Sequence, residues 1–184
     1  EHKHPSNFCQ PMYKTYNTEK SSASTSDRYD VLDYKLSLDV DPDADFFTGS
    51  VRIRFNNPLG DNAIVLDVTE PVLVDNVTSA GDDLVFDQTS DSLVVMLGNI
   101  NRVGGEDSIT VYYHAELLPS GNGLTVQDYH RRDPENIIKH GTVIASMSEP
   151  QDARSWWPCK DVPSDKATAT ISITAPDSIT AVSN

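Results

Sequence analysis

Hydrophobic and polar residues alternate with a period of two from residue 30 onward. The apolar positions of the first run are Leu32, Tyr34, Leu36, Leu38 and Val40. Such alternation is typical of a strand with one buried face. In a second run, Val51, Ile53 and Phe55 alternate with two arginines. Because the turn residues Asp41-Pro42-Asp43 separate the two runs, they predict a hairpin.

Further short apolar runs follow at regular spacing. They occupy residues 64–66, 72–74, 84–86, 93–97, 109–113, 142–146 and 168–174. Gly, Asn and Asp are frequent between the runs, and no window carries a helical period. The pattern predicts an all-β domain over residues 30–184, built as an antiparallel β-sandwich.

Three stretches depart from this pattern. Residues 1–29 show neither period, and seven of the twelve residues from 15 to 26 are Ser or Thr, which predicts a flexible polar arm. Residues 119–140 combine glycines, a proline and the mixed-charge run 129–133, which predicts a long loop. Residues 179–182 resemble the beginning of another strand, so we expect the chain to be truncated within its sandwich.

Composition excludes several kinds of partner. The chain has 184 residues, 38% of them hydrophobic, which is enough for one domain with its own core. Its formal net charge of −14 has the wrong sign for binding nucleic acid or an anionic membrane surface. No apolar run approaches the ~20 residues of a membrane-spanning helix. We therefore expect no nucleic-acid partner and no membrane span in this chain.

The start of the chain and one short motif bear on its location. The first residue is Glu1 rather than Met, and the segment after it is polar and rich in Ser and Thr. Asn76-Val77-Thr78 fits the sequon for N-glycosylation. These features favour an exported protein, either periplasmic or secreted.

No sequence pattern for catalysis or metal binding is complete. Acids occupy every second position from residue 39 to residue 45, as in some calcium-binding loops. The helix-loop-helix calcium loop requires Gly at its sixth position and Glu at its twelfth, but a loop starting at Asp39 would have Ala44 and Ser50 there. The five histidines form no His-Glu-x-x-His pair, and Cys-x-x-Cys and Gly-x-Ser-x-Gly are absent. We predict no catalytic residue, metal ligand or cofactor in this chain. The sequence leaves open whether Cys9 and Cys159 are bonded.

The most unusual segment runs from residue 146 to residue 167. It places two adjacent tryptophans, a cysteine, three prolines and several charges between two predicted strands. Tryptophans favour burial, whereas charges resist burial unless they are paired. We expect Arg154 to pair with Asp152 or Asp161 while Trp157 and Cys159 pack beneath. Taken by itself, the segment is a rigid corner of the sandwich.

This segment resembles the signature that closes the N-terminal domain of the membrane alanyl aminopeptidase family, the gluzincin zinc aminopeptidases that include the leukotriene hydrolases. The matching positions are Glu149-Pro150, Asp152-Ala153-Arg154, Trp157-Pro158-Cys159, Asp161, Pro163 and Lys166-Ala167. The similarity covers about residues 30–184 and includes Gly123-Leu124. It implies a saddle-like β-sheet domain that rests against a thermolysin-like domain carrying zinc.

The resemblance also implies two substrate-binding positions. The loop around Glu149 would reach the active-site cleft, where its carboxylate would help to hold the free α-amino group of a peptide substrate. Met147 stands where the family usually has Gln, whose amide helps to line the substrate pocket in relatives, so the substrate preference does not carry over. Val162 stands where the family has the Glu of Asp-Glu-Pro.

Two hypotheses about function follow. In the first, the chain is the non-catalytic N-terminal domain of a zinc aminopeptidase, inactive alone, whose partners are a peptide N-terminus and a downstream catalytic domain of the same polypeptide. In the second, it is a non-catalytic β-sandwich module for protein interaction. The hypotheses separate on whether the reading frame after Asn184 encodes the zinc-binding motif His-Glu-x-x-His.

Overall fold

The computed structural model describes residues 28–183 apart from 101–102, 122, 133–137 and 149–150. In chain order the described elements are β1 (Asp30–Asp39), β2 (Phe46–Asn56), β3 (Ala63–Asp67), β4 (Val72–Ser79), β5 (Asp82–Asp83), β6 (Phe86–Gln88), β7 (Ser92–Met96), the 3-10 turn η2 (Gly98–Ile100), β8 (Glu106–Glu116), β9 (Gly123–Arg132), β10 (Ile138–Met147), the 3-10 turn η3 (Ala153–Ser155) and β11 (Thr168–Thr174). Among these elements no helix is long and apolar enough to cross a membrane.

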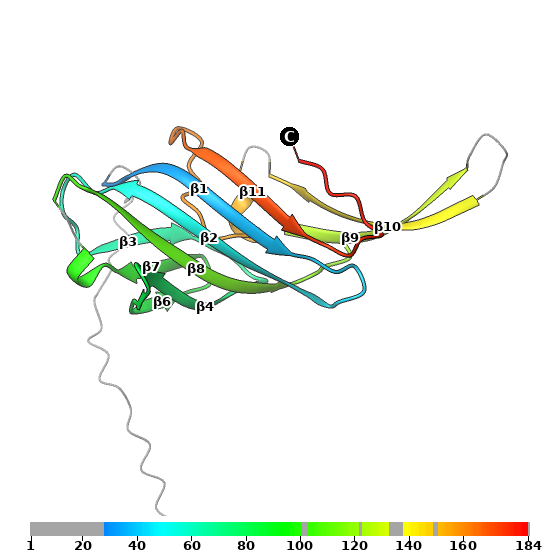
Figure 1. Cartoon of the computed structure of the whole chain (residues 1–184), viewed down its shortest axis with the longest axis horizontal. Coiled ribbons are helices and arrows are strands. Elements are labelled where there is room, and N and C mark those ends of the chain that lie inside the picture. Colours follow the sequence, from blue (N-terminus) through cyan, green and yellow to red (C-terminus); the bar gives the residue numbers. More distant parts are fainter. Residues whose placement is uncertain (1–27, 101–102, 122, 133–137, 149–150, 184) are drawn as a thin grey trace, which may run out of the picture.

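The strands form two packed sheets and a separate hairpin (Figure 1). The larger sheet has the order β11-β1-β2-β8-β4-β5, the smaller sheet has the order β3-β7-β6, and β9 and β10 form a two-stranded sheet. Neighbouring strands run antiparallel except for β1 and β11, which are parallel. The prediction of an all-β antiparallel sandwich is therefore confirmed, with the parallel pairing of β1 and β11 as the exception among the described strands.

The hydrophobic core lies between the two sheets. On β2, Val51, Ile53 and Phe55 are fully buried, whereas Arg52 and Arg54 face outward. The smaller sheet contributes buried side chains from β3 and β7, which are Ile64, Leu66, Leu93 and Val95. Burying each such side chain contributes on the order of 1.5–3 kcal/mol. The alternation in the sequence thus predicts which face of each strand is buried.

A β-bulge in β1 corrects one detail of the predicted pattern. Val31 pairs with Phe55, but Asp33 already pairs with Arg54, so an additional residue is accommodated in β1 at Leu32. Val31 is consequently buried, and Leu32 is only partly buried. The alternation predicted Leu32 as an inward position, and this is wrong because the bulge shifts the phase of the strand by one residue.

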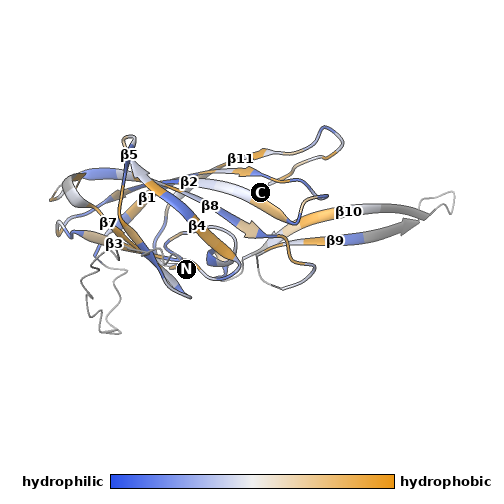
Figure 2. Ribbon diagram, turned by 90° about the horizontal axis from the view of Figure 1, so that it is seen from below, coloured by the Kyte–Doolittle hydropathy of each residue, from blue (hydrophilic) through white to orange (hydrophobic). Residues whose placement is uncertain are grey.

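The predicted long loop over residues 119–140 is also wrong. β9 and β10 instead pair residue by residue, from Gly123 with Met147 to Arg132 with Ile138. Two views show the hairpin extending away from the sandwich (Figures 1 and 2). Because most of its length lies outside the core, no buried face imposes the alternation from which strands are recognised in a sequence.

Two other predicted strands differ from the structure. Residues 84 and 85 form no strand but connect β5 in the larger sheet with β6 in the smaller one, so the chain changes sheets where a strand was predicted. Residues 179–182 form no strand either.

The start of the domain lies slightly earlier than the predicted boundary at residue 30. Tyr29 is buried in the core and donates a hydrogen bond of 2.7 Å from its hydroxyl to the carbonyl of Val65. Arg28 forms an ion pair with Asp61. These two residues of the expected arm therefore contact the sandwich, and residues 1–27 lie outside the described part of the chain.

Gly49 provides a test of the packing between β2 and β8. A Cβ atom at Gly49 would lie 2.4 Å from Cζ of Tyr113, its cross-strand partner, whose ring is buried and packs edge-on against Phe47. Since the ring has no room to move, Gly49→Ala is expected to lower the free energy of unfolding by about 1–3 kcal/mol in urea denaturation. Ser50→Ala on the outward face is the control, and equal stability of the two variants would contradict this packing.

Candidate functional site

The segment from residue 146 to residue 167, called the corner here, is fastened to the end of β3. Asp67 and Cys159 exchange two backbone hydrogen bonds, 2.7 Å from the Asp67 amide and 3.1 Å from the Cys159 amide. The Thr69 amide also donates to the carbonyl of Arg154 over 3.0 Å. The corner is therefore paired with the smaller sheet through its backbone.

A network of charges fixes the corner further. The Arg154 Nε donates to Asp161 Oδ2 over 2.8 Å, and its Nη1 lies 3.5 Å from Asp67 Oδ1. The second Asp67 oxygen, Oδ2, accepts a 2.8 Å hydrogen bond from the Asp161 amide. Of the two partners proposed for Arg154 from the sequence, Asp161 makes the ion pair, and it is only 9% exposed. Asp152 joins the network through its backbone amide instead.

Asp152 has an unusual backbone conformation immediately before η3. Its φ of 96° lies in the left-handed region, which costs a non-glycine residue of order 1–3 kcal/mol. Two groups hold this conformation: the Asp152 amide donates to Asp161 Oδ2 over 3.0 Å, and its carbonyl accepts a 2.6 Å hydrogen bond from the Ser155 hydroxyl. The Asp161 carboxylate thus bonds both Arg154 and the strained turn.

The two tryptophans make different contacts. Trp156 is buried, and its indole Nε1 donates to the Ser148 hydroxyl over 2.9 Å. Trp157 packs edge-on against Tyr34 of β1, with ring centroids 4.8 Å apart, and its buried Nε1 has no hydrogen-bond partner among the described residues. Trp156 therefore forms a hydrogen bond within the corner, to the residue that follows β10, and Trp157 joins the corner to β1.

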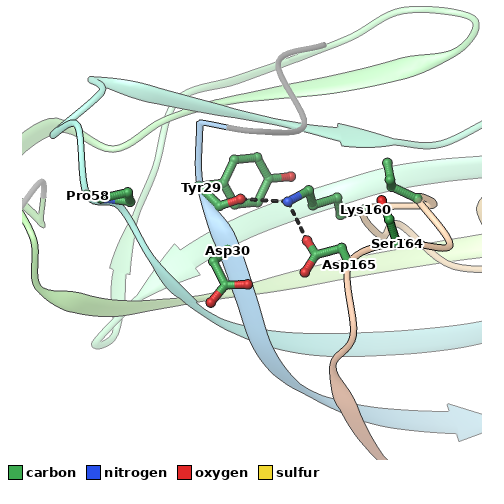
Figure 3. A pocket seen from close by; sticks show the side chains of 7 residues that line it. Tyr29, Asp30, Pro58, Lys160, Ser164 and Asp165 are labelled. Atoms are coloured by element: carbon green, nitrogen blue, oxygen red, sulfur yellow. Dashed lines mark hydrogen bonds and ion pairs between the residues drawn. The ribbon is translucent and has the colours of Figure 1, made fainter.

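Lys160 connects the corner to the first described residues of the chain (Figure 3). Its ammonium group donates to the Tyr29 carbonyl over 2.6 Å, pairs with Asp165, and lies 4.7 Å from the centroid of the Tyr29 ring. These groups border a pocket of about 260 Å³, lined by Tyr29, Asp30, Pro58, Lys160, Val162, Ser164 and Asp165. The Lys160 ammonium and the Asp165 carboxylate that border this pocket are paired with each other. This ion pair therefore stabilises the fold and offers no free charge to a ligand.

The structure locates only part of the site expected from the sequence. Glu149 lies outside the described residues, and Met147 is the last residue of β10, where its backbone pairs with Gly123. Gly123 passes so close to η3 that a Cβ there would lie 2.8 Å from the Ser155 carbonyl oxygen. Within the described part of the chain, no three His, Cys, Asp or Glu side chains lie close enough to share a metal ion.

Sequence reasoning missed the residues outside the corner that hold it in place. Asp67 is 94 positions from Asp161, and Tyr34, whose hydroxyl accepts a hydrogen bond from the Lys160 amide, is 126 positions from Lys160. Asp67 carries no local signal beyond being a polar residue at the end of an apolar run. Cys159 is buried and free of a disulfide in the described part of the chain, and Cys9 lies outside that part, so their pairing stays open.

Arg154→Ala tests the charge network. The substitution leaves the Asp161 carboxylate in a nearly buried position without its cation, and a hydrogen bond to a charged group contributes about 1.5–3 kcal/mol. We expect a loss of stability of this size in urea denaturation. Arg52→Ala is the matched control, because Arg52 is exposed and its hydrogen bond within the described part of the chain is a long one, 3.4 Å to the Ser108 hydroxyl. A melt of Arg154→Ala that superimposes on the parent would refute the network.

Cys159 generates a prediction about pH. Burial raises the pKa of its thiol well above the ordinary value of 9.0, and the carboxylates of Asp161 and Asp67 act in the same direction. Above pH 9 the unfolded chain loses this proton while the folded chain keeps it, so stability falls as the pH rises. The slope from this group approaches about 1.4 kcal/mol per pH unit.

The measurement is urea denaturation between about pH 8 and pH 10 under reducing conditions, comparing the parent with Cys159→Ala. Cys9 is present in both proteins, so any contribution of its titration is removed when the two stability curves are compared. The alanine variant is expected to lose less stability over this range, and parallel curves would show that the Cys159 thiol titrates normally in the folded protein.

Comparison with known proteins extends the interpretation beyond geometry. The chain is 28% identical to aminopeptidase M1 of Arabidopsis thaliana over 162 residues. This aligned region covers 82% of the present chain and 18% of the Arabidopsis protein. It is 51% identical to human glutamyl aminopeptidase over 64 residues, covering 34% of this chain and 6% of that protein. The chain therefore spans less than a fifth of the length of these relatives.

Solved structures show the same fold. The M1 zinc metallopeptidase from Deinococcus radiodurans superimposes with a TM-score of 0.63 at 26% identity, covering 82% of this chain and 33% of that one. A variant of that enzyme bound to a Tyr-Ser-Ala substrate gives a TM-score of 0.62 at 26% identity over 80% of this chain and 33% of that one.

The family match covers almost the whole described domain. Residues 29–184 match the family described as the peptidase M1 N-terminal domain, and the matched region begins at Tyr29, the first of the described residues to be buried in the core. The chain therefore belongs to the peptidase M1 family and comprises the N-terminal domain that is characteristic of this family.

Proposed function

We propose that this domain contributes the substrate-amine recognition of a zinc aminopeptidase that removes N-terminal residues from peptides. The observation that carries the proposal is the family match over residues 29–184 together with the family's signature in the corner, including Glu149. In this proposal the domain recognises the end of the substrate, and the downstream part of the polypeptide performs the hydrolysis.

The chemistry assigned to Glu149 follows from the charge of a peptide N-terminus. The α-amino group is protonated at neutral pH, and a carboxylate forms with it a charge-assisted hydrogen bond that is roughly twice as strong as a neutral one. A carboxylate fixed at one end of a cleft also determines which peptide bond lies at the reacting position, because the distance from the amine to the first peptide bond is constant. Such a group makes a peptidase specific for chain ends.

Rigid support is what this role requires of the surrounding residues. The corner is held by two backbone hydrogen bonds to β3, by the Arg154–Asp161 ion pair, by the buried Trp156 and by the partly buried Trp157. A carboxylate on a rigid support contributes more to binding than one on a flexible loop, since less conformational entropy is lost when the substrate binds.

Zinc is proposed to bind in the downstream domain, where it would act as the Lewis acid for hydrolysis. The described residues of this chain do not form a zinc site. We expect the full reading frame to encode His-Glu-x-x-His after Asn184. A frame without that motif would leave the interaction-module hypothesis in place.

Glu149→Gln in the full-length enzyme tests the role of the carboxylate. The substitution keeps the shape of the side chain and removes its charge, so kcat/KM for unblocked peptides is expected to fall by roughly tenfold or more, equivalent to about 1.4 kcal/mol. Glu116→Gln is the control, because Glu116 is an exposed acid at the end of β8. Unchanged kinetics in a folded Glu149→Gln enzyme would show that this acid does not recognise substrate.

A binding measurement separates recognition of the amine from a general loss of activity. The probes are an α-amino hydroxamate and its des-amino analogue, both of which bind zinc through the hydroxamate. Glu149→Gln should weaken the α-amino compound by about tenfold and leave the analogue unchanged, since only the first carries the cation. Equal weakening of both would indicate a distorted cleft instead.

A further inference from the structure

The sequon Asn76-Val77-Thr78 is the only Asn-x-Ser/Thr triplet in the sequence, and it lies in β4 of the larger sheet. Val77 is fully buried, whereas Asn76 and Thr78 are partly exposed on the outward face of the strand. Asparagine is depleted in strands, because its side chain packs poorly against the neighbours in a sheet. The needs of the sheet therefore do not explain an asparagine at position 76.

Two hydrogen bonds fix the side-chain amide of Asn76 at the surface. Its Oδ1 accepts a 2.8 Å hydrogen bond from the Val77 amide, and its Nδ2 donates to Asp83 Oδ1 over 2.9 Å. The Nδ2 of an asparagine carries two hydrogens. Only one of them is bonded within the described part of the chain, so a sugar can replace the other without loss of the contact with Asp83.

Three exposed apolar side chains surround Asn76 and are called the patch here: Leu73, Val85 and Tyr112, which are 53%, 68% and 44% exposed. Tyr112 is the cross-strand partner of Asn76 on β8, and Leu73 occupies the preceding outward position of β4, before a bulge. On the other side, the Leu84 amide donates to the Val77 carbonyl over 2.8 Å, which brings Val85 opposite Asn76. Exposed apolar side chains that cluster in this way mark a surface that another group covers.

The part of β4 that precedes the sequon also lies at an open edge of the larger sheet. β5 pairs only with Thr78 and Ser79, so residues 72–75 have no neighbouring strand on that side within the described part of the chain. The Val74 amide donates to the Gln88 side chain instead. Open edges invite the addition of a foreign strand unless something protects them. A bulky hydrophilic group at Asn76 would protect this edge and cover the patch.

We propose that Asn76 carries an N-linked oligosaccharide whose first sugars cover the patch. In the transfer, Asn76 Nδ2 forms a bond to the anomeric carbon of an oligosaccharide that is linked to a lipid through pyrophosphate. The bond from that carbon to the pyrophosphate oxygen breaks, the lipid pyrophosphate leaves, and Nδ2 loses one proton. This inference does not depend on the role of Glu149. It requires that the protein passes through a secretory compartment.

The burial of Val77 fixes when the transfer occurs. A transferase must reach Asn76 and the Thr78 hydroxyl together, but the residue between them lies in the core and β4 pairs with β8 along the sequon. The folded domain therefore does not present the three residues to an enzyme. The transfer precedes the folding of β4, and the outward direction of Asn76 then allows the domain to fold around the attached sugar.

The first experiment examines the protein isolated from its natural source. Peptide-N-glycosidase converts a glycosylated asparagine into aspartate, and in heavy-oxygen water the new carboxylate takes up the label. Mass spectrometry is expected to find labelled aspartate at position 76 in the treated protein and a glycopeptide in the untreated one. An unmodified Asn76 in the natural protein would overturn the proposal.

The second experiment uses two variants of the full-length protein secreted from eukaryotic cells. Thr78→Ser keeps the hydroxyl of the sequon, whereas Thr78→Val removes it and keeps the β-branched shape that suits a strand. Thr78→Ser is expected to carry as many oligosaccharides as the parent, and Thr78→Val is expected to carry one fewer. Equal numbers in Thr78→Val and the parent would show that Asn76 is not modified.

Binding of an apolar fluorescent dye tests whether the sugars cover the patch. Thr78→Val is expected to bind more dye than the parent, because the patch loses its cover, and adding Tyr112→Ser should remove much of that increase. Equal dye binding by Thr78→Val and the parent would overturn the covering role. A patch covered by a bound protein in the natural preparation, with Asn76 unmodified, would assign this surface to a protein partner and refute the glycan. Thermal melts verify that each variant is folded.

Discussion

The attachment of the corner to Asp67 is the interaction on which the rest of this structure depends. Asp67 is the last residue of β3, and its backbone pairs with Cys159 while its carboxylate accepts a hydrogen bond from the Asp161 amide and approaches Arg154. Few residues could do this, because the position requires both a strand conformation and two acceptor oxygens directed at the neighbouring segment of the same chain. Without this attachment, the Asp161 amide and the Arg154 guanidinium would each lose a partner, and partly buried polar groups without partners are costly.

This attachment makes the corner an extension of the sandwich rather than a surface loop. Cys159 and Trp156 are members of the same buried cluster as the strands, and Lys160 reaches back to the carbonyl of Tyr29 at the beginning of the domain. The first described residues and the segment that precedes β11 are thereby connected. A segment held in this way can present a side chain to a neighbouring domain with little loss of conformational entropy, which is the property that recognition of a small charged group requires.

Sequence patterns predicted the fold where a buried face imposes a period, and they failed where it does not. The alternation on β2 was sufficient because every second residue there faces the core. It failed at Leu32, since a bulge changes the phase, and over β9 and the first residues of β10, where a projecting hairpin has hardly any core to face, although the predicted run at residues 142–146 does lie in β10. In the site, the Arg154–Asp161 pair was one of two predicted alternatives because both residues lie in one segment. Asp67 and Tyr34 could not be predicted, since nothing local indicates a partner that is distant in the chain.

Hydrogen–deuterium exchange of residues 146–161 in the full-length enzyme tests the central claim most directly, namely that the corner is one wall of the substrate site. The exchange is followed with and without a bound α-amino hydroxamate, and the des-amino analogue serves as the reference. The account predicts slower exchange in this segment with the α-amino compound than with the analogue, because only the former carries the ammonium group that Glu149 is proposed to bind. Identical exchange with both compounds, together with protection elsewhere in the enzyme, would place the amine site outside this domain and contradict the account.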